Sequence, residues 1–172
     1  MKSSTQHVAL YQLSYSQLKT YLIAALFIVG NIVLPQLCHL LPQGGLIFLP
    51  IYFFTLVAAY KYGLTAGLTT AVLSPLVNSA LFGMPLAAAL PIILIKSVTL
   101  AIAAALIAKR TNKVTIITVA LAVIAYQFIG SIAEWVMTGS IEKASQDIIL
   151  GWPGCLIQIL GGYVILRYLL TK

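Results

Sequence analysis

The feature that most constrains this chain is a series of apolar runs, each long enough to cross a lipid bilayer. A helix needs about 20 apolar residues to span a hydrocarbon core about 30 Å thick. Six runs, separated by polar residues or by Gly and Pro, fall at about 20–41, 45–61, 63–83, 86–108, 114–137 and 148–170. Because unpaired backbone groups are costly in lipid, helix is the expected form. The sequence therefore predicts an all-α membrane protein with six transmembrane helices. Since the second run is the shortest, a tilted or partly re-entrant second segment is an alternative.

The composition agrees with lipid as the main solvent. Of the 172 residues, 61% are hydrophobic and 8% are charged, whereas soluble domains average about 25% charged residues. Six crossings leave room for short loops only, and no soluble catalytic domain fits in what remains. We divide the chain into a short cytoplasmic N-terminal segment at residues 1–19, which has no cleavable signal, and a transmembrane domain at residues 20–172.

Basic residues predict the orientation of the six segments. In a six-pass arrangement, one side of the membrane carries Lys2, Lys19, Lys61, Lys109, Arg110, Lys113, Arg167 and Lys172. The other side carries Lys143, beside Glu142 and Asp147. By the positive-inside rule, both termini are cytoplasmic. The net charge of +7 then follows from topology, and a nucleic-acid partner is not needed to explain it.

Two charged residues fall inside apolar segments, where a charge needs a partner, a water-filled cavity or a function. Lys96 lies about ten residues inside its run, and Glu134 lies near the outer end of the fifth run. At 1.5 Å per residue, Lys96 is expected about 15 Å below the outer boundary and Glu134 about 5 Å below it. A direct ion pair then needs a long reach or a displaced helix. Pairing with each other and binding of a ligand both remain open.

Uncharged polar residues form stripes that rise toward the outside. Gln127, Ser131 and Glu134 share one helix face because they are spaced by four and three. Similar stripes are formed by Thr70, Ser74 and Asn78, and by Trp152, Cys155 and Gln158. Hydrogen bonds between helices are the simpler explanation for any single Ser or Thr. Pro and Gly also cluster in the outer half, which indicates broken helices and a pocket open to the exterior. Small residues such as Ala101, Ala104, Ala105 and Ala108 fill the inner half and favour close packing.

The usual motifs of catalysis and cofactor binding are missing from the sequence. There is no Walker lysine loop, no glycine-rich dinucleotide turn and no His-Glu-x-x-His helix. Cys38 and Cys155 are far apart and lack metal-ligand spacing, so we expect two inert thiols. No metal, no cofactor and no enzymatic activity are predicted, with a small membrane enzyme as an alternative.

The six-pass layout and the segment from Ser74 to Pro85 resemble the substrate-binding S components of energy-coupling factor (ECF) transporters. The residues that carry the resemblance are Asn78-x-x-Leu81-Phe82-Gly83-Met84-Pro85. The resemblance implies a bacterial or archaeal cell membrane, a vitamin or related micronutrient bound in an outward-facing pocket, and transport by a transmembrane T component with two cytoplasmic ATPases. Such subunits often dock through Ala-x-x-x-Ala on the first helix. The nearest versions here are Thr20-x-x-x-Ala24 and Ala25-x-x-x-Val29, so Thr20, Ala24 and Ala25 are the predicted docking residues.

The predicted substrate-binding residues are Lys96, Glu134, Trp135, Asn78, Gln127, Trp152 and Gln158. A buried Lys96 favours a carboxylate or phosphate, while Glu134 can accept a hydrogen bond or pair with a cationic nitrogen. Trp135 or Trp152 can stack on a planar ring. An amphoteric, partly aromatic vitamin-like molecule satisfies all three. The alternatives are a secondary carrier that uses Lys96 and Glu134 for proton coupling, and a structural membrane protein without a ligand.

Overall fold

The computed structural model describes residues 13–170, and every regular element within them is a helix. The elements are α1 (Leu18–Cys38), α2 (Gly44–Phe48), the 3-10 helix η1 (Pro50–Tyr52), α3 (Phe53–Tyr62), α4 (Leu64–Phe82), α5 (Leu90–Thr111), α6 (Ile116–Thr138), α7 (Ile141–Ile149) and α8 (Trp152–Leu170). The all-α prediction is confirmed for this range. Lys2, Lys172 and the first twelve residues of the predicted N-terminal segment lie outside it.

Several helices are suited to a membrane. Helices α1, α4, α5 and α6 are each long and apolar enough to cross one, and α7 and α8, which meet at 46°, together form a fifth candidate. The outer surface of the bundle is apolar as well. On α1, for example, Leu22, Leu26 and Val33 are 63%, 68% and 50% exposed. Because water-exposed surfaces rarely carry apolar patches of this extent, the chain is a multi-pass membrane protein.

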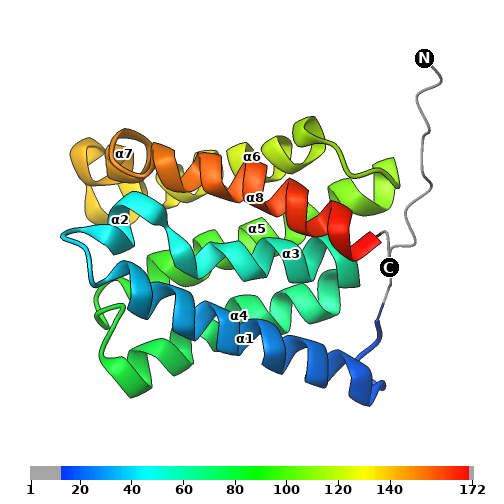
Figure 1. The fold of residues 1–172 in the computed structure, drawn as a ribbon. Helices are drawn as coiled ribbons and strands as arrows, with labels where there is room; N and C mark the ends of the chain where they lie inside the picture. Colours follow the sequence, from blue (N-terminus) through cyan, green and yellow to red (C-terminus); the bar gives the residue numbers. More distant parts are fainter. Residues whose placement is uncertain (1–12, 171–172) are drawn as a thin grey trace.

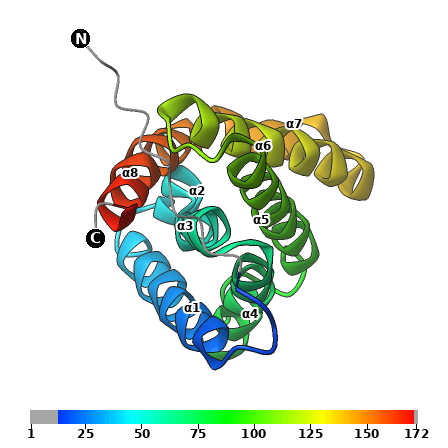
Figure 2. The ribbon, with the colours of Figure 1, turned by 90° about the vertical axis from the view of Figure 1, so that its right-hand side faces the viewer.

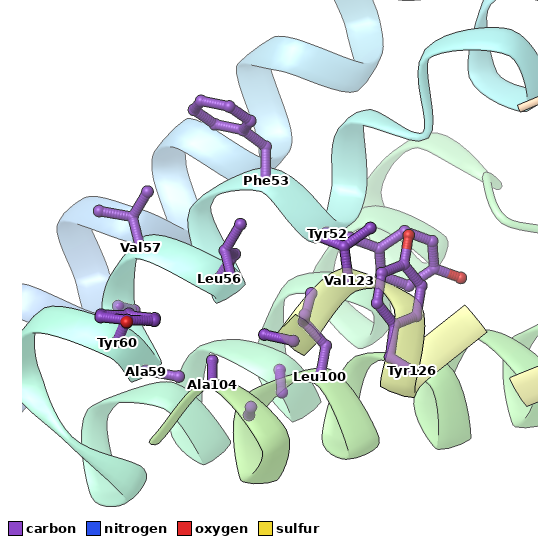
Figure 3. Close-up of a cluster of buried hydrophobic side chains, with 14 of the residues drawn as sticks. Tyr52, Phe53, Leu56, Val57, Ala59, Tyr60, Leu100, Ala104, Val123 and Tyr126 are labelled. Carbon is purple, nitrogen blue, oxygen red and sulfur yellow. The ribbon is translucent and has the colours of Figure 1, made fainter. Parts of the chain in front are cut away.

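Helix α3 lies in the centre of the bundle (Figures 1 and 2) and is packed against α1, α4, α5 and α8. Residues Leu56, Val57 and Ala59 are completely buried, as expected for a helix that is apolar on every side. Glycine permits the close approach of α4, because a Cβ atom on Gly67 would lie 2.4 Å from the Cβ of Ala59. Figure 3 shows this hydrophobic core, which Leu100 of α5 also joins.

The second apolar run is not the continuous helix that was predicted over residues 45–61. It forms α2, η1 and α3 in succession, and the break falls at Leu49, whose φ of 47° is left-handed. Pro50 follows at the start of η1, and its missing backbone N–H favours the start of a new helix there over continuation of α2. Helix α3 is ten residues long, about 15 Å, or half the hydrocarbon thickness. This interruption explains why the second run is not among the candidate spans.

The last apolar run is also divided differently from the prediction over residues 148–170. Helix α7 ends at Ile149, and α8 begins at Trp152 after a bend. Glycine allows this corner to pack tightly, since a Cβ on Gly151 would lie 2.4 Å from the carbonyl oxygen of Asp147. A Cβ on Gly154 would lie 2.5 Å from backbone atoms of Phe48. The corner therefore joins α7, α8 and α2 at one end of the bundle.

The other end of the bundle collects the basic residues. Helix α1 begins there and α8 ends there (Figure 1). The N–H of Leu13 donates to the carbonyl of Tyr62, and the Tyr60 hydroxyl donates to the carbonyl of Lys113, so the α3–α4 and α5–α6 connections also lie at this end. Terminal turns and connections here carry Lys19, Lys61, Lys109, Arg110, Lys113 and Arg167. Lys143 lies on α7, at the opposite end (Figure 1).

Candidate functional site

The ammonium group of Lys96 contacts two carboxylates, and these three residues are called the ion cluster below. Its Nζ lies 2.5 Å from Oε2 of Glu134 and 2.8 Å from Oδ2 of Asp147. Helices α5, α6 and α7 thus supply one charged group each. The Lys96 side chain is 3% exposed, whereas those of Glu134 and Asp147 are 16% and 13% exposed. The ammonium group is enclosed, and the carboxylates form a partly accessible edge.

Lys96 meets Glu134 because α5 begins later than the predicted run over residues 86–108. The helix starts at Leu90, whose N–H donates to the carbonyl of Leu86 in the preceding loop. At 1.5 Å per residue, Lys96 lies about 9 Å from the start of α5, and Glu134 about 6 Å from the end of α6. The expected difference in depth of about 10 Å falls to about 3 Å. The ion pair that the sequence left open is therefore present.

Glycine on α6 makes room for the lysine. A Cβ atom on Gly130 would lie 2.4 Å from Cγ of Lys96, 3.0 Å from Cε and 3.1 Å from Cδ. A larger residue at this position would displace the methylene groups along the Lys96 side chain and not merely its flexible end. The position of Gly130, one turn before Glu134, therefore fixes the path by which the ammonium reaches the carboxylates.

The ion cluster has an excess of negative charge. The whole chain contains three acidic residues, Glu134, Glu142 and Asp147, and two of them contact Lys96. With both carboxylates ionised, the cluster carries a net charge of −1. Each carboxylate gives one oxygen to Lys96, and no described residue donates a hydrogen bond to Oε1 of Glu134 or Oδ1 of Asp147. These two oxygens are available to another group.

A buried hydrogen-bonded network, the Tyr126 network, lies beside the ion cluster. Gln127 Nε2 donates to the hydroxyl of Tyr126 (3.2 Å) and to Sγ of Cys155 (3.1 Å). The Tyr126 hydroxyl donates to Oε1 of Gln158 (3.0 Å). The amide nitrogen of Gln158 donates to the carbonyl of Leu49, just before η1 (3.3 Å). Tyr126 and Cys155 interact electrostatically with Asp147. The structure thus brings predicted residues Gln127 and Gln158 together near Lys96 and Glu134.

Tyr52 joins these two groups. Its residue is 2% exposed, and its ring centre lies 5.1 Å from that of Tyr126. Figure 3 shows both hydroxyls at the end of the core away from Tyr60. The Tyr52 hydroxyl interacts electrostatically with Asp147 and Glu134, yet within residues 13–170 it forms no hydrogen bond. A hydroxyl that has no hydrogen bond and lies close to two carboxylates is typical of a site that a ligand or water completes.

Further polar atoms around the cluster also lack partners. Oε1 of Gln127, Oγ of Ser97 and Oγ of Ser131 are buried without a hydrogen bond in the part of the chain that the structure describes. Ser97 adjoins Lys96 in the sequence, and Ser131 shares a helix face with Glu134. Buried polar groups are normally hydrogen-bonded, so each of these three atoms can form a further bond with an occupant. Three other buried atoms without a partner, in Gln36, His39 and Asn78, lie on other parts of the described chain.

An apolar groove of about 380 Å³ lies between α6 and α7, beside the ion cluster. Its walls include Phe128, Ser131 and Trp135 of α6, and Ile141, Ala144 and Ile148 of α7. Glu134 and Asp147 are sequence neighbours of two of these residues. The unpartnered hydroxyl of Ser131 belongs to this wall, so the groove and the polar region share a border.

Asn78, also predicted to bind substrate, belongs to a separate polar cluster that joins α1, α3 and α4. Its amide donates to the carbonyl of Asn31 at 2.8 Å. The Asn31 side chain donates to Thr55 (3.0 Å) and Ser74 (3.2 Å) and accepts from the N–H of Phe54 (3.1 Å). Asn31, Thr55, Ser74 and Asn78 are at most 1% exposed. The stripe on α4 therefore links helices, which is the simpler of the two explanations that the sequence allowed.

The two predicted tryptophans are exposed, and two of the three predicted docking residues are buried. Trp135 is 50% exposed at the groove, and Trp152 is 59% exposed at the start of α8. Of the predicted docking residues, Thr20 and Ala24 lie on the buried face of α1, and Ala25 is exposed. On the described surface, only Ala25 of these three is accessible to a partner.

The sequence alone does not predict that Asp147, Tyr52 or Asn31 belongs to a polar cluster. Asp147 was expected in an outer loop, but α7 turns it inward. The available signal was the spacing of Ile141, Ala144 and Ile148, which marks one apolar face of a short helix. Tyr52 could not be found in this way, because its position depends on the break before η1.

Neither a metal site nor a relative accounts for the cluster. Residues 13–170 contain no group of three or more His, Cys, Asp or Glu side chains that could hold a metal ion. Cys38 and Cys155 are free thiols, as expected. Comparisons of the chain with protein-family models, with curated proteins and with solved structures find no match.

Proposed function

We propose that this chain captures a small vitamin-like molecule at the ion cluster, as the substrate-binding S component of an ECF importer in a bacterial or archaeal cell membrane. In this proposal the chain crosses the membrane six times, both termini are cytoplasmic, and the ion cluster faces the exterior. Transport depends on a transmembrane T component and two cytoplasmic ATPases.

One observation carries the binding role: the ion cluster lies within apolar helices and is surrounded by polar atoms without partners. Charged groups at membrane depth are expensive, and they typically mark substrate or ion sites. A purely structural ion pair would have balanced charge and satisfied hydrogen bonds. Here one ammonium faces two carboxylates, the Tyr52 hydroxyl has no hydrogen bond among the described residues, and Oε1 of Gln127 is unpaired.

The six-pass topology is supported by the course of the chain. Four long helices and the bent α7–α8 pair are five candidate passes, and α2, η1 and α3, which follow one another through the bundle (Figure 1), are assigned here as the sixth. Non-helical backbone at this depth is tolerated because it is buried inside the bundle. The basic residues at the end opposite α7 favour a cytoplasmic position for that end.

Dependence on partners is supported by the sequence, which has no phosphate-binding loop to drive uptake. The resemblance to S components supplies the class of partner. The small residues of α5 are consistent with a chain that binds the ligand and leaves transport to its partners, because they pack the inner half tightly while the polar groups lie in the outer half.

The experiment is to purify the chain in detergent and identify co-purified small molecules by mass spectrometry. We expect one compound that is enriched in the natural protein, is lost from the double variant Glu134→Gln/Asp147→Asn, and raises the melting temperature when added back. Glu142→Gln is the matched control, because Glu142 is an exposed acidic residue on α7. A natural protein and a double variant with identical small-molecule content and no ligand-dependent stabilisation would overturn the proposal.

The unbalanced carboxylates also support a second candidate, a secondary carrier that couples substrate to protons. Intramembrane Asp and Glu residues serve as proton relays in such carriers. Proteoliposomes that contain this chain alone separate the two functions. Concentrative uptake driven by a proton gradient establishes the carrier, whereas binding without uptake supports the S component.

A further inference from the structure

We infer that the ligand presents a positively charged nitrogen group to Glu134 and Asp147, so the bound molecule belongs to the cationic or amphoteric class. This inference rests on the proposed binding function of the ion cluster. It reverses the sign expected from Lys96 alone, which favours a carboxylate or phosphate.

The burial of the three charged groups determines what an incoming ligand meets. The Lys96 side chain is 3% exposed, and its ammonium already donates to two carboxylates. A ligand anion would have to displace one of those carboxylates while lying close to the other. The accessible atoms belong instead to the carboxylates, which are 16% and 13% exposed and have Oε1 and Oδ1 free of donors from the described residues. The edge of the site is therefore negative, although a lysine lies at its base.

The charge balance supports the same conclusion. One ammonium against two carboxylates leaves a net charge of −1 in a site built from apolar helices. At low effective dielectric an uncompensated charge is costly, and one additional positive group neutralises the cluster. An amine or amidine supplies that charge together with hydrogen-bond donors for the two free carboxylate oxygens.

The unpartnered neutral groups are suited to the same ligand. The Tyr52 residue is 2% exposed, and its hydroxyl lies within electrostatic range of Asp147 and Glu134. Oε1 of Gln127, an acceptor, is buried and unpaired, and the residue is 6% exposed. Oε1 of Gln127 can only accept a hydrogen bond, and the Tyr52 hydroxyl can accept as well as donate, so both can receive a bond from an N–H group of the ligand.

A divalent metal ion is a poorer occupant. Hard cations such as Mg²⁺ and Ca²⁺ take six or more oxygen ligands, and Lys96 already holds the position between the two carboxylates. No described group of His, Cys, Asp and Glu has the composition of a metal site. An organic cation needs only the outer oxygens and leaves the lysine in place.

The test uses the full purified chain in detergent and a defined probe, the small-molecule ultrafiltrate of yeast extract. The ultrafiltrate is separated into cation-exchange, anion-exchange and unretained fractions, with amphoteric molecules collected in the first at low pH. Each fraction is titrated against the protein while the melting temperature is recorded. We expect the cation-exchange fraction to raise the melting temperature. In Glu134→Gln and in Asp147→Asn, the amount of this fraction that gives half of the maximal rise should increase about tenfold or more. That factor corresponds to one charge-assisted hydrogen bond.

Each outcome decides the inference. Stabilisation by the anion-exchange fraction, with equal or greater sensitivity in Glu134→Gln, overturns the cationic class and leaves the proposed binding function standing. Stabilisation by no fraction contradicts the binding function as well. Equal titrations of the natural protein and both variants by the cation-exchange fraction place the ligand elsewhere and overturn the inference. Tyr52→Phe, which keeps all three charges, is the additional variant if a carboxylate variant does not fold, and Glu142→Gln is the control that should titrate like the natural protein.

Discussion

Replacing Lys96 by Met tests the ion cluster most directly. Methionine keeps most of the length of the stem and removes the positive charge, so Gly130 and α6 are left with a similar neighbour. The two carboxylates then lose the ammonium that both of them contact. Because Glu134 and Asp147 are largely buried, neither recovers full hydration.

The size of the effect follows from the two distances. Nζ lies 2.5 Å and 2.8 Å from the two oxygens, so those oxygens are at most about 5.3 Å apart. At an effective dielectric constant of about 20, two negative charges at that separation repel by about 3 kcal/mol. Loss of one partner from a buried ion pair costs about 3–5 kcal/mol. Partial exposure of the carboxylates favours the lower end, so we expect a loss of about 3 kcal/mol in the free energy of unfolding.

The assay is equilibrium unfolding in mixed micelles, followed by circular dichroism as the fraction of denaturing detergent rises. Adding Glu134→Gln to Lys96→Met should recover about half of the loss, because it removes the repulsion but leaves Asp147 without a partner. Lys143→Met is the matched control, since Lys143 is exposed on α7; a change within about 0.5 kcal/mol is expected there. A Lys96→Met protein as stable as the natural one, with both carboxylates present, would refute the reasoning.

Three further predictions concern other parts of the structure. Gly130→Ala places a methyl group 2.4 Å from Cγ of Lys96 and should lower ligand affinity with little loss of helix content, as measured by titration and circular dichroism. Asn31→Ala removes the three hydrogen bonds of its side chain, to Thr55, Ser74 and the N–H of Phe54, and should lower the free energy of unfolding by about 2–3 kcal/mol. An unchanged midpoint would contradict this role. In a cysteine-free background, a cysteine at Gln43 should react with an impermeant reagent on intact cells, and one at Asn112 only after permeabilisation; exterior labelling at Asn112 would invert the topology.

The sequence predicts the helices that face lipid better than it predicts the one that does not. Long apolar runs with polar ends define α1, α4 and α6 to within a few residues, because a bilayer demands length and continuous hydrophobicity. Helix α3 escapes this rule, since it is surrounded by other helices and can be short. The left-handed φ at Leu49 separates α2 from η1, and the Leu49 carbonyl accepts a hydrogen bond from the Gln158 side chain of α8. Pro50 is a local signal of this break, but hydropathy does not show it.

The sequence identifies Lys96 and Glu134 as charged residues of the site. It does not show that a third charged residue joins them, or how the three are arranged. Lys96 and Glu134 stand out because each is isolated in an apolar run. Their pairing depends on a shift of a few residues in the start of α5, which is within the uncertainty of any boundary taken from hydropathy. Asp147 reaches the cluster only through the bend between α7 and α8. The third charge gives the cluster two carboxylates for one ammonium, an imbalance that the first two residues alone do not indicate.

The triple variant Lys96→Met/Glu134→Gln/Asp147→Asn separates stability from function. Neutral side chains of similar size replace all three charges, so no buried charge is left without a partner, and replacement of whole buried ion pairs is often neutral or stabilising. We expect a free energy of unfolding within about 1 kcal/mol of the natural protein, together with complete loss of ligand-dependent stabilisation. The measurement is the same micelle titration, combined with melting curves in the presence of the cation-exchange fraction. A triple variant that unfolds as readily as Lys96→Met alone would show that the cluster holds α5, α6 and α7 together. Recovery of stability without recovery of binding would instead assign the ion cluster as a whole to the ligand.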